Sequence, residues 1–315
     1  MKPFEKMQKD SKIFVAGSDT FIGSSIVRSL RKNGYNNLIG LEKKQPDLLD
    51  KISISNFFRE STPEYVFSAA GAIGGIGANL ESPAFFMLDN LLTETNIISA
   101  SHDAGVKKLI YLASSCTYPK DSPQPMKPEY LMTGPLEPTS EFYATAKLTG
   151  IKLCEAYNKQ YGDNFYSVIP ANPFGPGDSF DPETGHVIGA LLEKLHTALK
   201  SESEYIDVWG TGKPRRDFIF IEDLGDACVF AMENFQGNRP LNLGTNNDIS
   251  ITELANLLID ITGFNGAIKY DRTKSDGTAV KLLDASDILD LGWTPSTNLR
   301  EALETTYNWF LNNKA

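Results

Sequence analysis

The sequence predicts an α/β fold, a doubly wound parallel sheet with a smaller C-terminal α/β lobe. Short apolar runs typical of buried parallel strands alternate with amphipathic helical segments through the first half of the chain. A turn with two glycines joins the first strand to the first helix. Beyond about residue 172 the alternation stops, and segments rich in glycine and proline mix with shorter strands.

The first half divides into strands joined by helical crossovers, as a parallel sheet requires. Buried strands are expected at 12–17, 37–42, 65–70, 107–114 and 166–172, with a further strand end at 48–50. Helices are expected at about 21–34, 82–105 and 140–161. In the second half, Ser250 and Glu253 form a capping box that opens the helix 253–263.

These elements predict two units. Residues 12–172 form a dinucleotide-binding domain, to which a segment at about 217–245 returns. Residues 173–216 and 246–315 form the smaller lobe.

Composition excludes several classes of protein. The net charge of −10 argues against a nucleic-acid surface, because phosphate backbones bind net basic faces. No apolar run approaches the roughly 20 residues that span a bilayer, and the charged residues 1–12 predict a short solvated leader. Cys116, Cys154 and Cys228 lie too far apart for a disulfide framework or a metal site. We therefore expect a reduced, cytoplasmic protein without a metal.

The stretch "VAGSDTFIG" predicts where a dinucleotide binds. Gly17 allows a tight turn at the strand end, and Gly23 lets the helix pack closely on the sheet. Thr20, Phe21 and Ile22 lie between them, at a helix N-terminus that would face the pyrophosphate. Two glycines in an ordinary turn are the alternative, since Thr20 stands where a middle glycine is usual. The strand before and the helix after favour a Rossmann NAD(P) site.

Three residues further along bear on the choice of cofactor. Glu42 would accept the hydroxyls of the adenosine ribose, as in NAD, whereas the adjacent Lys43 would bind the 2′-phosphate of NADP. Asp50 is a candidate for the adenine amino group, or else a loop or cap aspartate. The choice between NAD and NADP stays open at this point.

The pattern "YATAK" places Tyr143 and Lys147 on one face of a helix. A tyrosine phenol has a reference pKa near 10, and a neighbouring ammonium is expected to lower it toward the range in which it exchanges protons. Such a pair donates a proton to a carbonyl oxygen or removes one from an alcohol. Ser114, at a strand end upstream, would hydrogen-bond the same substrate oxygen. A surface Tyr–Lys pair and a cap serine are the alternatives.

The glycine turn, "SS" after a strand, Tyr143 with Lys147, and "RRDFIFIEDL" together resemble the extended short-chain dehydrogenase/reductase family, which acts on nucleotide sugars. Within it, five longer motifs resemble the GDP-L-fucose synthase family: "GGIGAN", "SSCTYPKDSPQPMKPEYLMTGPLEPT", "AKLTGIKLCEAYNKQYG", "VWGTGKPRRDF" and "KSDGTAVKLLD". That family implies 3,5-epimerisation and 4-reduction of GDP-4-keto-6-deoxymannose with NADPH, and a homodimer formed through two long helices of each subunit. The helices expected at 82–105 and 140–161 would serve.

The resemblance assigns the epimerisation to a cysteine and a histidine that exchange protons at carbons 3 and 5, and these fall on Cys116 and His186. A thiol and an imidazole both titrate near neutrality. Without the resemblance, a buried small hydrophobe would be the better interpretation of Cys116. His102 and His196 have no such support and are expected on helix surfaces, while the other two cysteines are expected in the core.

The resemblance also implies residues that bind the GDP-sugar. They are Asn172, Lys194, Trp209, Arg216 and Lys281. Asp19 departs from the family, which often has an arginine there to bind the 2′-phosphate. NADP(H) is therefore the family expectation, and NAD(H) is kept open by Asp19 and Glu42. Three hypotheses follow: the bifunctional enzyme, a single-function epimerase or 4-reductase on another nucleotide 4-ketosugar, and a non-catalytic nucleotide-binding module.

Overall fold

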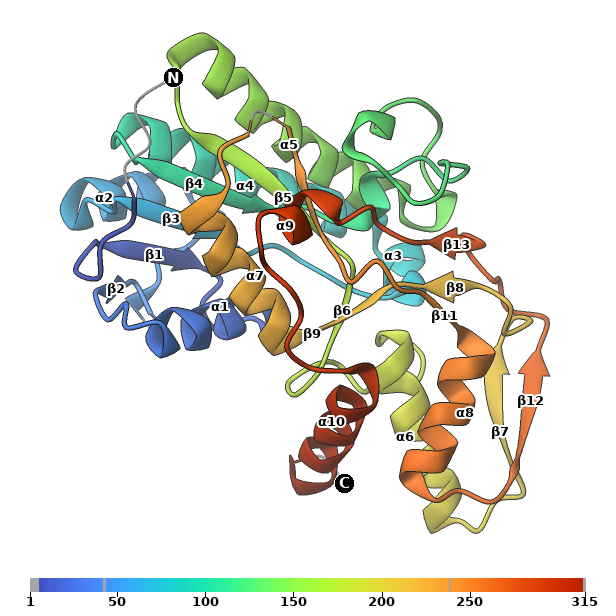
Figure 1. The fold of residues 1–315 in the computed structure, drawn as a ribbon. Helices are drawn as coiled ribbons and strands as arrows, with labels where there is room; N and C mark the ends of the chain where they lie inside the picture. The colour runs from blue at the N-terminus through green and yellow to red at the C-terminus, as the bar shows by residue number, and fades with distance from the viewer. Residues whose placement is uncertain (1–5, 42–43, 238, 314–315) are drawn as a thin grey trace.

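The computed structural model describes residues 6–41, 44–237 and 239–313. A six-stranded sheet in the order β10-β5-β4-β3-β1-β2 lies at its centre, and every neighbouring pair in it is parallel (Figure 1). Its strands are β1 (Ile13–Ala16), β2 (Leu38–Ile39), β3 (Tyr65–Ser68), β4 (Lys108–Leu112), β5 (Phe165–Pro170) and β10 (Leu241–Leu243). The predicted doubly wound α/β fold is confirmed.

Helices cover both faces of this sheet (Figure 1). One layer packs α2 (Lys51–Ser61), α4 (Pro83–Asp103) and α5 (Glu141–Tyr161) together. The other layer pairs α1 (Phe21–Lys32) with α7 (Ile221–Asn234). The strand order reverses between β1 and β3, so the crevice in which such sheets bind ligands opens at the carboxyl ends of these two strands.

Smaller sheets build the remainder. They are β11-β8-β13, β12-β7 and β6-β9. Their strands are β6 (Asn172–Phe174), β7 (Tyr205–Trp209), β8 (Arg215–Arg216), β9 (Phe218–Phe220), β11 (Ile249–Ser250), β12 (Ala267–Asp271) and β13 (Val280–Lys281). The other helices are α3 (Ile76–Glu81), α6 (Val187–Lys200), α8 (Ile251–Thr262), α9 (Ser286–Asp290) and α10 (Leu299–Asn313). Short 3₁₀ turns lie at Ser115–Thr117, Pro128–Tyr130 and Pro138–Ser140.

Some predicted elements differ from the structure. Residues 48–50 form turns and no strand, because the Asp50 side chain accepts from the Ile52 N–H and caps α2. Asn172 does not end the strand before it but begins β6. The expected solvated leader includes Met7, which is 3% exposed and packs in the core. None of the described helices has both the length and the apolar composition needed to cross a membrane.

The core bears out the expectation for two cysteines and corrects it for two histidines. Cys154 and Cys228 are 1% and 0% exposed. His102 is half-buried and its Nδ1 lies 2.6 Å from the Asp163 Oδ2. His196 is also half-buried, against the Phe310 ring. Neither is a free surface residue, because α5 and its following turn cover the first and α10 covers the second.

Candidate active site

Most of the predicted catalytic and substrate residues line one cavity of about 340 Å³. It opens beside the carboxyl end of β4, where the six-stranded sheet meets the smaller strands. Among its lining are Ser114, Cys116, Tyr143, Asn172, His186, Lys194, Trp209, Arg216 and Lys281. Segments that lie far apart in the sequence thus converge on it, which no local pattern in the sequence reveals.

Ser114 and Cys116 are held by the turn that follows β4. The Ser114 hydroxyl accepts from the Cys116 N–H at 3.2 Å, and the Thr117 hydroxyl donates to the Ser114 carbonyl at 2.7 Å. The 3₁₀ turn Ser115–Thr117 begins here and brings Ser114, Ser115 and Cys116 to the cavity wall, where Cys116 is half-buried. Cys116 is therefore not the buried small hydrophobe that its residue type alone favours.

Tyr143 projects from the first turns of α5 and lines the cavity together with Ser114. Burial raises the pKa of its phenol, the charge of Cys116 raises it further, and the Ser114 hydroxyl lowers it less. The prediction that this pKa is lowered is wrong, because burial outweighs the influence that lowers it. The Lys147 ammonium donates to the Leu112 carbonyl at 3.3 Å. A raised pKa keeps the phenol protonated, which is the form that a proton donor needs.

Cys116 lies beside a cation. Its Sγ is 3.5 Å from the Lys281 Nζ. Burial raises the pKa of the thiol, but the Lys281 ammonium and hydrogen bonds with Ser114, Ser140 and Lys281 outweigh it, so the pKa lies below its ordinary value. Thiolate is the form that removes a proton, and this surrounding favours it.

His186 is the N-cap residue of α6, and its Nδ1 lies 2.9 Å from the Asp178 Oδ1. Burial lowers the pKa of the imidazole, yet the Asp178 carboxylate and the charge of Cys116 raise it more, so imidazolium persists to higher pH than usual. With Nδ1 donating to Asp178, Nε2 is the ring nitrogen left for the cavity. The sequence analysis did not single out Asp178 or Ser140. The one hint in the sequence was position: Asp178 lies eight residues before His186, and Ser140 lies three residues before Tyr143.

The cations expected to bind a diphosphate are arranged by strand pairing. β13 runs parallel to β8 with Lys281 opposite Arg216, and both residues line the cavity. Arg215 instead bonds Asp248 and Glu253, at 3.0 and 3.1 Å, because successive strand residues face opposite sides. The structure thus separates two arginines that are adjacent in sequence.

Trp209 lies at another part of the same cavity. The Lys194 Nζ is 5.1 Å and the Lys274 Nζ 4.4 Å from the centre of its ring. Asn172 donates from its side chain to the Asp217 carbonyl at 2.7 Å, which fixes it where β6 begins. The Trp209 ring can stack on a flat part of a ligand, and the two lysine ammonium groups can bind negative charge on it.

The glycine turn fits a dinucleotide. Gly17 has a φ of +78°, and a Cβ on Gly23 would come within 1.9 Å of the Gly17 carbonyl oxygen. Thr20 caps α1 by accepting from the Gly23 N–H at 3.0 Å, and the first-turn amides of Phe21 and Ile22 have no acceptor within the helix. Of these, Ile22 lines the cavity.

Gln45, which sequence reasoning also missed, lies against this turn. Its Oε1 accepts from the Gly17 N–H at 2.6 Å, and its Nε2 lies 3.5 Å from the Asp19 Oδ1. Glu42 and Lys43, the two candidates for reading the ribose, lie outside the described residues.

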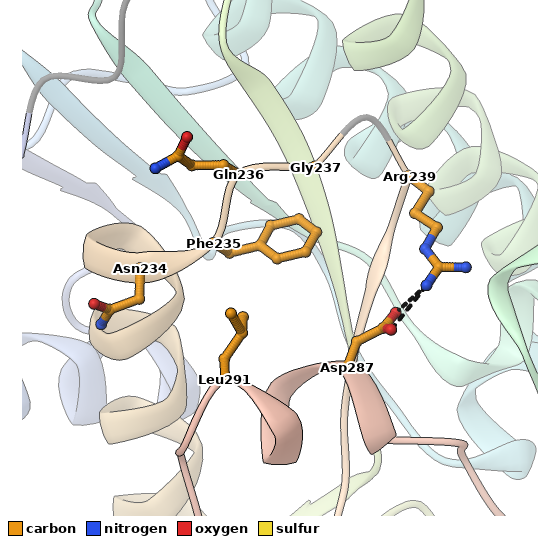
Figure 2. Close-up of a pocket in the computed structure, with 7 residues that line it drawn as sticks. All are labelled: Asn234, Phe235, Gln236, Gly237, Arg239, Asp287 and Leu291. Carbon is orange, nitrogen blue, oxygen red and sulfur yellow. Dashed lines mark hydrogen bonds and ion pairs between the residues drawn. The ribbon is translucent and has the colours of Figure 1, made fainter.

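A second hollow, of about 560 Å³, offers no comparable chemistry. It is lined by Asn234, Phe235, Gln236, Gly237, Arg239, Asp287 and Leu291 (Figure 2). Its arginine donates two 2.8 Å hydrogen bonds to Asp287 and is already neutralised. None of the predicted site residues lines it.

Known proteins resemble the chain over nearly its whole length. Residues 13–244 match the NAD dependent epimerase/dehydratase family. The chain is 45% identical to GDP-L-fucose synthase 1 of Arabidopsis thaliana, over 97% of this chain and 94% of that one. A GDP-L-fucose synthetase structure from Naegleria fowleri bound to NADP has a TM-score of 0.89 at 30% identity, covering 98% and 96% of the two chains. A GDP-6-OMe-4-keto-L-xylo-heptose reductase from Campylobacter jejuni has a TM-score of 0.90 at 33% identity, covering 98% and 100%.

These matches agree with a parallel sheet that carries a glycine turn, and with a cavity lined by Tyr143, Cys116 and His186. Lys147 is buried and does not line this cavity. The chain belongs to the NAD-dependent epimerase/dehydratase family, in the group of the GDP-L-fucose synthases.

Proposed function

We propose that this chain converts GDP-4-keto-6-deoxy-D-mannose to GDP-L-fucose, by 3,5-epimerisation followed by reduction of the 4-ketone. One observation carries the proposal. Ser114 and Tyr143, suited to a ketone oxygen, line the same cavity as Cys116 and His186, suited to the two carbons beside it. A reductase alone has no need of the second pair.

The epimerisation follows from the charges of these groups. The Cys116 thiolate removes the proton at a carbon alpha to the ketone, and Ser114 and Tyr143 donate hydrogen bonds to the enolate oxygen that forms. The imidazolium of His186 delivers a proton to the opposite face of the same carbon. Exchange with solvent then restores both groups, so each epimerised carbon acquires a solvent proton.

The cofactor we propose is NADP(H), which supplies a hydride to carbon 4 when bound. Gly17 and Gly23 would admit the pyrophosphate to the N-terminus of α1, and Lys147 would hold the ribose beside the ketone. Tyr143 gives its proton to the oxygen as the ketone is reduced, and its raised pKa keeps that proton available. Asp19 in the phosphate turn makes a direct comparison of NADPH with NADH informative.

We assign the cofactor to residues 12–172 with the returning segment 217–245, and the GDP-sugar to residues 173–216 and 246–315. Arg216 and Lys281 would bind the diphosphate, because they lie opposite each other on neighbouring strands and each can bind one of the two phosphate groups. Lys194 and Asn172 would complete the polar contacts, and Trp209 would pack on the flat part of the ligand.

A single-function C4 reductase is the second candidate, and the likeness to the heptose reductase favours it. Solvent exchange separates the two candidates. Purified protein is incubated in D₂O with GDP-4-keto-6-deoxymannose and either NADPH or NADH. Deuterium at carbons 3 and 5 together with cofactor oxidation supports the bifunctional enzyme. Cofactor oxidation without deuterium supports the reductase alone, and neither signal contradicts both.

We also propose a homodimer in the cytoplasm, formed through α4 and α5. Both helices lie in the same layer and expose apolar side chains. On and beside them lie Leu80, Phe85, Leu88, Leu92 and Phe142, which are 38–60% exposed. On α4 these residues recur at helical spacing, so they form one stripe that a second copy would cover.

Light scattering on a sizing column tests this surface. Leu88→Glu is expected to convert the dimer to a monomer, because it buries a charge in the contact. Leu291→Glu changes an apolar residue that is 44% exposed elsewhere and leaves the mass unchanged. A monomeric unmodified protein contradicts the proposal.

A further inference from the structure

A buried carboxyl group lies behind the catalytic helix α5. Glu94 of α4 is 2% exposed, on the side of the helix that faces the sheet. Its Oε2 accepts a short hydrogen bond from the Tyr111 hydroxyl, and its Oε1 has no hydrogen-bond partner among the described residues. A carboxyl in such surroundings is costly unless an opposite charge compensates it.

Tyr111 of β4 connects this carboxyl to α5. Its hydroxyl lies 3.4 Å from the Lys147 carbonyl oxygen, and the Lys147 Nζ is 5.1 Å from the centre of its ring. Gly150 makes room for the ring, since a Cβ there would come within 2.4 Å of the Tyr111 Cζ. Three elements thereby bring Glu94, Tyr111 and Lys147 together, away from solvent.

The charges of Glu94 and Lys147 depend on each other. Burial lowers the pKa of Lys147, which is 4% exposed, while the carboxylates of Glu94 and Asp89 raise it. Burial raises the pKa of Glu94 to about 7, against the Lys147 ammonium and the Tyr111 hydrogen bond, which lower it. Among the described residues, the Lys147 ammonium donates a hydrogen bond to the Leu112 carbonyl. Because this carbonyl carries no full charge, the buried ammonium needs a nearby carboxylate to stay protonated.

Other groups face this pair. Glu94 also acts on Tyr143 and Cys154 of α5, and raises the pKa of both. Asp89, one and a half turns earlier on α4, accepts from the Ala72 N–H at 2.7 Å and acts on Lys147 less strongly than Glu94. Glu94 is therefore the dominant negative charge near the Lys147 ammonium.

We propose that Glu94 is a positioning residue whose carboxylate, behind the active site, keeps Lys147 protonated to higher pH than the buried ammonium would reach without it. The inference rests on the proposed function, because Lys147 acts there through the cofactor and Tyr143. At low pH Lys147 is protonated whether or not Glu94 is ionised. As the pH rises, the Glu94 carboxylate lets Lys147 keep its proton to higher pH, so turnover should fall at a higher pH than it would without this charge.

The test is the pH dependence of kcat in Glu94→Gln, which keeps the shape and removes the charge. Below about pH 6 the unmodified protein carries a neutral Glu94, so the two proteins should differ by less than about twofold. Above about pH 8 the variant should be slower by about tenfold, because Lys147 loses its proton there. A loss that is the same at every pH overturns the proposal, since a merely structural defect would behave that way.

Tyr111→Phe keeps the carboxyl and removes the hydrogen bond that lowers its pKa. Glu94 then ionises at higher pH and compensates Lys147 less, so the fall in turnover on the alkaline side should begin at lower pH, and an unmoved fall counts against the proposal. This variant also serves if Glu94→Gln does not fold. Ser101→Ala is the matched control: the residue is fully buried on the same helix, bonds only the Ile97 carbonyl in the contacts described, and should not alter the pH profile.

A second measurement needs no turnover. The infrared difference spectrum of the cofactor-free protein between acid and alkaline pH should contain the carbonyl stretch of a buried protonated carboxylic acid. Burial also raises the pKa of Asp217 to about 7, so this second buried carboxyl contributes to the band. The band should lose amplitude in Glu94→Gln and keep its full amplitude in Ser101→Ala. If the amplitude is unchanged in Glu94→Gln, the inference fails. If no substrate turns over but the band behaves as expected, the proposed function fails while the buried ionisation of Glu94 stands.

Discussion

The Lys281 Nζ lies 3.5 Å from the Cys116 Sγ, although the two residues are 165 positions apart in the chain. The strand β13 carries the ammonium, and the turn after β4 carries the thiol. An opposite charge at this distance favours the thiolate. Lys281, expected from the sequence only as a contact to the GDP-sugar, therefore also sets the charge of the base that we propose for epimerisation.

Removing this ammonium should weaken the base. In Lys281→Met the pKa of Cys116 rises, because its main lowering influence is lost, so less thiolate exists at neutral pH. Deuterium exchange into the substrate should slow by about tenfold or more at pH 7 and recover at higher pH. The rate of alkylation of Cys116 by iodoacetamide should fall in parallel. Lys274→Met removes a cation that lies near Trp209 instead, and it should leave the alkylation rate unchanged.

Cys116→Ser tests the base itself. A hydroxyl is far harder to ionise than a thiol, so exchange at carbons 3 and 5 should slow by about 100-fold or more. Binding of NADPH, measured by fluorescence, should stay within about twofold, because the glycine turn and Lys147 are untouched. Normal deuterium uptake in this variant would refute the assignment of Cys116.

Asp178→Asn tests the proposed acid. The Asp178 carboxylate raises the pKa of His186, so imidazolium persists to higher pH in the unmodified protein. Without that charge the imidazolium is lost at lower pH, and exchange at about pH 8 should fall at least tenfold while exchange at about pH 6 changes less. A parallel loss at both pH values would point to disruption of the 178–179 turn instead, where Asp178 also accepts from the Ser179 N–H.

Two adjacent arginines provide a matched pair. Arg216→Met should raise the KM for the GDP-sugar about 10- to 100-fold, because it removes hydrogen bonds to a charged diphosphate that are worth about 1.5–3 kcal/mol. Arg215→Met should leave the KM nearly unchanged, since Arg215 is already bonded to Asp248 and Glu253. Equal effects of the two substitutions would contradict the contact that we assign to Arg216.

The sequence predicted the local elements well because their causes are local. The expected helix 140–161 is α5, Glu141–Tyr161, and the capping box at Ser250 and Glu253 forms as expected. The error at 48–50 has a local cause too: a short apolar run resembles a strand, and the aspartate that ends it caps the next helix. The direction of the Tyr143 pKa was wrong because burial, which the sequence does not report, outweighs the expected effect of a neighbouring ammonium.

By itself, the sequence determined the parallel sheet, the glycine turn and the Tyr143–Lys147 spacing, because periodicity and motif spacing depend on residues close in the chain. The assignment of Cys116 and His186 came from the resemblance to a family. Only the tertiary structure decided how those groups are charged. It places Lys281 beside Cys116, Asp178 beside His186 and Glu94 behind Lys147. A pKa depends on burial and on charges within a few ångströms, and here most of these come from distant segments.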